Sequence, residues 1–155
     1  MTLKIHNMKT YVVTVSKFFP GFHPKKGEET GFVEKILSGE KIHTIRGNLE
    51  LWEKRIAEVQ EGKAVLSLRY WSGKPYRSPQ VEFKQLTSVD GVGIQEIEFY
   101  REICTNTLVD YFSENYSKIA QNDGLGRGDY VDWFASGKYD LSKPMAIIQF
   151  TKFRY

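Results

Sequence analysis

The amino-acid sequence predicts an α+β fold, a small mixed β-barrel of five or six strands with flanking helices. Short runs of β-branched and aromatic residues, which are typical of strands, cover residues 10–15, 41–46, 63–71, 81–88, 94–100 and 145–153. Between them, apolar residues recur at three- and four-residue spacing and indicate helices over residues 30–38, from about 48 to Gly62, 105–121 and 129–135. Several strands are separated only by turn residues, as in hairpins, which favours a barrel over a doubly wound parallel sheet.

The predicted helices have recognisable ends. Thr30 can cap the first helix, and Gly39 can end it because glycine tolerates a left-handed backbone. The second helix begins near Asn48 and ends at Gly62. Its expected buried side is formed by Leu49, Trp52, Ile56 and Val59.

Turn residues separate the later elements. The run over residues 63–71 alternates between two faces, and Ser72-Gly73-Lys74-Pro75 follows it as a turn. Asp90-Gly91-Val92-Gly93 predicts a hairpin between the strands at 81–88 and 94–100. The glycine-rich run Gly124-Leu125-Gly126-Arg127-Gly128 lacks the ending of a phosphate-binding loop and follows a helix, so we expect a flexible connection there.

The composition predicts one domain, residues 1–155, without linkers, repeats or low-complexity tracts. A net charge of +3 permits contact with phosphate without requiring it. Cys104 is the single cysteine, and the three histidines are too scattered for a familiar metal-ligand spacing, so we expect neither a metal nor another cofactor. No apolar run reaches membrane-spanning length, and the first residues lack the apolar centre of a signal peptide, so we expect a cytoplasmic protein that does not enter membranes.

The densest set of chemically active side chains follows Gly39. Lys41, His43, Thr44 and Arg46 lie within six residues at the start of a predicted strand. They could bind an anionic or nucleobase-like ligand, or they could belong to a solvated edge strand whose isoleucines point inward. Strict alternation would place Lys41 and Thr44 on opposite faces, so joint action would require a bulge or twist. A lysine could activate the Thr44 hydroxyl only if burial or nearby positive charge lowered its pKa, and Arg46 is a candidate neighbour.

Two further segments are candidates for ligand contact. The aromatic-rich loop at 18–24 is followed by Lys25, and both His23 and Lys25 could contribute to a site, although a surface turn anchored by phenylalanines explains most of the loop. The run at 69–77 interleaves aromatic and basic residues, a combination that suits an unpaired nucleotide. Its candidate contacts are Arg69, Trp71, Tyr76 and Arg77. The alternative is a hairpin whose aromatic residues pack against the barrel end.

Residues 32–46, FVEKILSGEKIHTIR, resemble the signature of ASCH domains, which belong to the PUA-like superfamily. The resemblance implies a PUA-like barrel that binds RNA or a modified nucleoside. One branch of small ASCH proteins removes the acetyl group from N4-acetylcytidine with a Lys, a Thr and a Glu. Lys41 and Thr44 match the first two positions. The chain diverges from the family pattern after Ser88, so no residue matches the Glu directly, and Glu96 and Glu98 are the candidates for it.

Three hypotheses follow from the sequence. The first is a module that binds RNA or a modified nucleoside through a cleft over Lys41, Thr44 and Arg46. The alternative is an amidohydrolase acting on an N4-acylated cytidine-type nucleoside, with Lys41 as base, Thr44 as nucleophile and Glu96 as a candidate acid. A third is a protein-interaction domain with Trp71 and Tyr76 on its contact surface.

Overall fold

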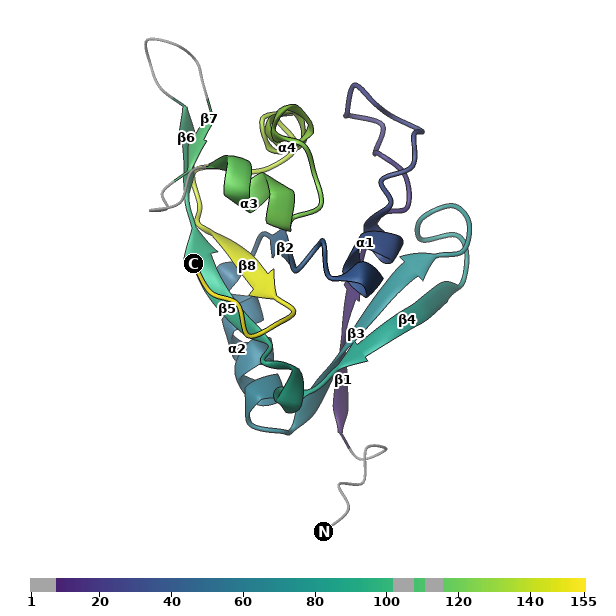
Figure 1. Ribbon diagram of the computed structural model, residues 1–155, viewed down its shortest axis with the longest axis vertical. Coiled ribbons are helices and arrows are strands. Elements are labelled where there is room, and N and C mark those ends of the chain that lie inside the picture. Colours follow the sequence, from purple (N-terminus) through teal and green to yellow (C-terminus); the bar gives the residue numbers. More distant parts are fainter. Residues whose placement is uncertain (1–7, 102–107, 111–115) are drawn as a thin grey trace.

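The computed structural model describes residues 8–101, 108–110 and 116–155, and it shows a mixed α+β fold (Figure 1). Its strands are β1 (Lys9–Thr14), β2 (His43–Arg46), β3 (Ala64–Trp71), β4 (Gln80–Leu86), β5 (Gly93–Ile97), β6 (Phe99–Arg101), β7 (Leu108–Asp110) and β8 (Met145–Gln149). Its helices are α1 (Phe32–Ser38), α2 (Leu49–Gln60), α3 (Tyr116–Asn122) and α4 (Arg127–Phe134), with the 3-10 turn η2 (Ser88–Asp90). Within these described ranges, no helix has the length and apolar character needed to cross a membrane.

The strands form two three-stranded sheets and one two-stranded ribbon. The first sheet has the order β1-β3-β4, with β1 parallel to β3 and β4 antiparallel to it. The second has the order β2-β8-β5 and is antiparallel throughout. β6 and β7 pair separately. The central strand β8 is buried at all five positions, so the core surrounds it.

Helix α2 packs against strands of both sheets and closes the core on one side (Figure 1). Its predicted apolar stripe is confirmed, because Trp52, Ile56 and Val59 are buried. Its predicted start is also confirmed, since the Asn48 side chain accepts a hydrogen bond from the backbone N–H of Leu51. These features depend on residues close together in the chain, which is why spacing alone located the helix.

A closed barrel is not seen in the part of the chain that the structure describes. β1 and β2 are edge strands of different sheets, and no backbone ladder joins them. A side chain bridges the gap instead: the Arg46 guanidinium donates a hydrogen bond to the backbone oxygen of Thr14. With only four residues, β2 offers a short edge for pairing.

Two predictions about the middle of the chain were wrong. β4 and β5 do not form a hairpin, because β4 pairs with β3 and β5 pairs with β8. A capping box between Thr87 and Asp90 starts the turn η2, and the chain then crosses to the other sheet. The predicted helix at 105–121 is also interrupted, since Leu108–Asp110 is a strand and α3 begins only at Tyr116. The rest of that prediction, with Cys104, lies outside the described residues.

Candidate functional site

A small charged cavity lies where β2, α1, the glycine-rich loop and α4 meet. Its volume is about 60 Å³. The polar and charged residues that line it include Lys41, Thr44, Arg46 and Asp123. Apolar and aromatic side chains form much of the rest of the wall, among them Phe32, Leu125, Trp133, Phe134 and Tyr139. Three of the residues predicted around Gly39 are therefore brought together in one cavity, and a carboxylate from a distant segment joins them.

Lys41 is held in place at both ends. Its backbone N–H bonds to the Lys35 oxygen at 3.0 Å, because α1 ends at Gly39 in a left-handed conformation that turns the chain back. Its side chain is 2% exposed, and its Nζ donates to Asp123 Oδ1 at 2.8 Å and to the Asp123 backbone oxygen at 2.6 Å. The Phe32 ring lies 4.3 Å from Nζ.

The bulge considered from the sequence is not needed. β2 begins at His43, so Lys41 lies before the strand and outside its alternation. Lys41 and Thr44 therefore line the same cavity without any irregularity within β2. Thr44 and Arg46, two residues apart on the strand, also line it, together with Ile45 between them.

The start of the glycine-rich loop forms part of the site, a role that the expectation of a flexible connection did not include. Asp123, Gly124 and Leu125 are buried. Gly124 has a φ of +80°, and a Cβ at this position would lie 3.1 Å from Lys41 Cδ. Lys35 Nζ also donates to the Gly124 oxygen at 2.8 Å. A glycine is thus required here both by the backbone conformation and by the close approach of the Lys41 stem.

Burial and neighbouring charges set the protonation states of Lys41 and Asp123. Burial lowers the pKa of Lys41, the nearby charges of Arg46 and Lys35 act in the same direction, and the Asp123 carboxylate opposes them. Burial tends to raise the pKa of Asp123, but the attraction of Lys41 and the approach of His43 outweigh it and hold that pKa below its ordinary value. Asp123 therefore stays ionised, while Lys41 releases its proton more readily than a solvated lysine.

Arg46 and Thr44 present groups that the protein leaves available. Across the described residues, no carboxylate forms an ion pair with Arg46, whose guanidinium bonds to the Thr14 backbone oxygen. The Thr44 side chain is buried against the cavity, and its hydroxyl makes no hydrogen bond within the same described part of the chain. Arg46 is half-buried, and a guanidinium that faces a cavity without an ion-pair partner among the described residues favours an oxygen-bearing ligand there.

Asp123 takes the place beside Lys41 that the sequence could not assign. Glu96, the earlier candidate, is exposed on β5 and does not line the cavity. Glu98 follows that strand and is exposed as well. Asp123 is 82 positions from Lys41 in the chain. The only local sign of its role is an acidic residue directly before the left-handed Gly124.

His43, a predicted ligand contact, lies behind the cavity. It is fully buried, and its Nδ1 is 3.4 Å from Asp123 Oδ1. Its Nε2 is 2.6 Å from the Tyr155 hydroxyl. Burial lowers its pKa, against the opposing influence of Asp123, so the ring is neutral near pH 7.

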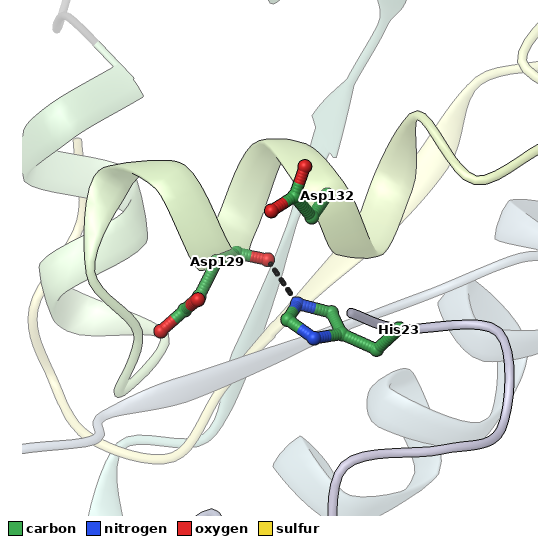
Figure 2. A group of neighbouring side chains, drawn as sticks. All are labelled: His23, Asp129 and Asp132. Atoms are coloured by element: carbon green, nitrogen blue, oxygen red, sulfur yellow. Dashed lines mark hydrogen bonds between the residues drawn. The ribbon is translucent and has the colours of Figure 1, made fainter. Parts of the chain in front are cut away.

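His23 and Lys25 connect the aromatic-rich loop to α4 and do not line the cavity. Figure 2 shows His23 beside Asp129 and Asp132, whose ligand-type atoms lie within 4.8 Å of one another. His23 Nδ1 accepts from the Lys25 backbone N–H at 3.0 Å, so Nε2 carries the proton and donates to the Asp129 backbone oxygen at 3.0 Å. Lys25 Nζ pairs with the Asp129 carboxylate at 2.7 Å. Since both ring nitrogens and one carboxylate are engaged, we interpret this group as a structural connection.

The basic and aromatic residues at 69–77 lie on the β3–β4 hairpin. Arg69 bonds to Ser67 and Gln80 on the sheet, whereas Arg77 is exposed. Trp71 and Tyr76 lie 5.1 Å apart between ring centroids, and Tyr76 is 88% exposed. Trp71 also lines a second, mainly apolar cavity of about 320 Å³ together with residues 15–21, Gly73 and Pro75. This apolar cavity shares Val15 and Ser16 with the charged cavity, so the two are neighbours.

Comparisons with protein-family models, curated proteins and solved structures give no match to this chain.

Proposed function

We propose that the charged cavity binds an oxygen-bearing group of a modified nucleoside, either free or within RNA. The observation that carries the proposal is Arg46, a guanidinium that faces the cavity without a carboxylate partner among the described residues. Its free N–H groups suit a carbonyl or phosphate oxygen. With Lys41 and Asp123 compensating each other, Arg46 leaves the cavity with a net positive charge.

The size of the cavity favours a small substituent over a whole nucleoside. A volume of about 60 Å³ accommodates roughly four to six water-sized atoms. An acylated amide at the edge of a base has this size, whereas a complete small-molecule pocket measures about 300–1,000 Å³. The base and sugar would then remain at the mouth, near the neighbouring apolar cavity.

The hairpin supports the RNA form of the proposal. Tyr76 presents an exposed ring supported by Trp71, and Arg77 adds a solvated positive charge. Arg69 already bonds to the Ser67 and Gln80 side chains on the sheet and would contribute mainly by keeping these side chains in place. Exposed aromatic faces next to cations bind unpaired bases with little sequence preference.

The resemblance of residues 32–46 to the ASCH signature agrees with this function. We extend the proposal to the fold: the chain would be a PUA-like barrel opened between β1 and β2, where the Arg46 side chain spans the two edges. A strand ladder between these edges, seen in an experimental structure with ligand bound, would support that relationship.

Calorimetric titration tests the binding proposal. We expect N4-acetylcytidine and short single-stranded RNA to bind, with RNA affinity falling as salt rises. Arg46→Gln should weaken both by about tenfold or more, because it removes charge-assisted hydrogen bonds. Arg55→Gln on α2, where Arg55 lies over Tyr11 and Trp52, removes the same charge outside the cavity and is the matched control. Wild-type protein that binds neither ligand at low salt would refute the proposal.

A second candidate function is hydrolysis of the acyl-amide, and the lowered pKa of Lys41, in the cavity that Thr44 also lines, favours it. Neutral Lys41 would take the Thr44 hydroxyl proton while Oγ1 bonds to the amide carbon, with Arg46 donating to the developing oxyanion. The C–N bond then breaks, and the Lys41 ammonium returns the proton to the leaving nitrogen. Water finally cleaves the Thr44 acyl ester and releases the carboxylic acid.

Chromatographic assay of N4-acetylcytidine turnover tests the hydrolase. We expect Thr44→Val to abolish release of cytidine while preserving volume, and Lys41→Met to do the same. Thr44→Ser retains the hydroxyl and should retain measurable activity. Full activity of the valine variant would eliminate Thr44 as the nucleophile.

A further inference from the structure

A chain of polar contacts runs from the half-buried Tyr155 through buried side chains to the charged cavity. The Asn122 side-chain amide donates to the Tyr155 hydroxyl oxygen at 3.1 Å, and that hydroxyl lies 2.6 Å from His43 Nε2. His43 Nδ1 lies 3.4 Å from Asp123 Oδ1, which accepts from Lys41 Nζ at 2.8 Å. The side chains of His43, Asp123 and Lys41 are each at most 6% exposed.

The directions of these contacts follow from what each group can donate. Since Asn122 donates to the Tyr155 oxygen, the hydroxyl proton of Tyr155 can point to His43 Nε2. The neutral imidazole then carries its proton on Nδ1, facing the Asp123 carboxylate. The opposite tautomer would bury an unprotonated Nδ1 against an ionised oxygen, which is repulsive. Among the described residues, Nδ1 forms no hydrogen bond in the present geometry, and the Asp123 carboxylate, with Oδ1 3.4 Å away, is the ionised group that faces it.

We infer that Tyr155 and His43 are positioning residues that keep Asp123 ionised and turned toward Lys41, so that Lys41 can release its proton inside the cavity. When Lys41 is neutral, Asp123 loses its countercharge, and an N–H on His43 Nδ1, which lies 3.4 Å from Oδ1, is a second side-chain donor that faces the carboxylate. The inference deepens the hydrolase proposal and rests on it for the role of Lys41. The charged groups around Lys41 are Asp123 from the loop, Arg46 from β2 and Lys35 from α1.

Replacing Tyr155 by Phe tests the inference with a minimal change. The variant loses the hydroxyl that fixes the histidine tautomer, so part of the His43 population moves its proton to Nε2. Asp123 then has one donor fewer and attracts the Lys41 proton more strongly, which raises the pKa of Lys41. Tyr11→Phe is the matched control, because the Tyr11 hydroxyl bonds to Glu58 between β1 and α2, away from the cavity.

Two measurements need no substrate. In ¹⁵N NMR spectra, we expect His43 of the wild type to be protonated at Nδ1, with Nε2 protonation increasing in Tyr155→Phe. In a pH titration followed at the Lys41 Nζ and Cε signals, we expect the midpoint to move upward in Tyr155→Phe and to stay unchanged in Tyr11→Phe. Wild-type His43 protonated at Nε2, or an unchanged Lys41 midpoint in Tyr155→Phe, would overturn the inference.

Turnover measurements separate this inference from the hydrolase proposal. If the wild type deacylates N4-acetylcytidine, Tyr155→Phe should lose rate near neutral pH and regain it at higher pH, whereas a merely structural defect would lower the rate at every pH. A wild type without turnover, but with the expected tautomer and Lys41 shift, refutes the hydrolase and leaves the positioning chain supported.

Discussion

The buried ion pair between Lys41 and Asp123 should reveal itself in a double-mutant cycle. Nζ and Oδ1 are 2.8 Å apart, and the two side chains are 2% and 6% exposed. Lys41→Met leaves the Asp123 carboxylate buried without its ion-pair partner, with His43 Nδ1 3.4 Å away, and Asp123→Asn leaves a buried ammonium facing neutral acceptors. Removing one partner of such a pair costs about 3–5 kcal/mol, because the remaining charge is uncompensated.

The double variant Lys41→Met/Asp123→Asn should lose less than the sum of the two single variants. It buries no unpaired charge from this pair, so we expect a coupling free energy of about 1–3 kcal/mol. Urea denaturation at pH 7 measures the free energy of unfolding of all four proteins. For a chain of this length, a loss of about 3 kcal/mol also corresponds to a fall in Tm of roughly 6–12 °C.

Additivity would refute this reasoning. If the double variant loses the sum of the single effects to within about 0.5 kcal/mol, the two side chains act independently and the pair does not compensate its own burial. Single variants that each lose less than about 1 kcal/mol would likewise mean that water reaches the pair, as it does in exposed salt bridges.

Three further predictions concern stability. Burial lowers the pKa of His43 below its ordinary 6.5, so the unfolded chain binds this proton at a higher pH than the folded protein does. The free energy of unfolding should therefore fall as pH drops through about 6.5, by at most about 1.4 kcal/mol per pH unit. Urea melts at pH 5 and pH 7 should show a smaller difference in this free energy for His43→Gln than for the wild type. Gly124→Ala should lower the free energy of unfolding by about 1–2 kcal/mol in thermal melts, because the φ of Gly124 is +80°. Gly128→Ala in α4, where a Cβ would meet open space, should be neutral or stabilising. Equal effects of the two variants would contradict the conformational argument. In urea melts, Ile56→Ala should lower the free energy of unfolding by about 2–5 kcal/mol, and Leu51→Ala on the exposed side of α2 should lower it much less. Similar losses for the two variants would mean that the core does not lie on the Ile56 side of α2.

The sequence by itself determined the features that depend on neighbouring residues. Asn48 and Gly62 flank α2, Gly39 ends α1, and the turn after residue 71 leads from β3 into the antiparallel β4. The grouping of Lys41, Thr44 and Arg46 was also readable, since all three lie within six positions. Caps, left-handed glycines and apolar spacing act over a few residues, so their consequences are local.

Only the tertiary structure decided which distant segments meet. Thr87 and Asp90 looked like part of a hairpin, but whether β4 or β8 pairs with β5 depends on how the two sheets pack around α2. No sequence feature favours Asp123 over Glu96, because neither lies in a motif that marks a carboxylate beside Lys41. The carboxylate beside Lys41 comes from a loop 82 positions away, and its contact is imposed by the burial of a charge that requires a partner.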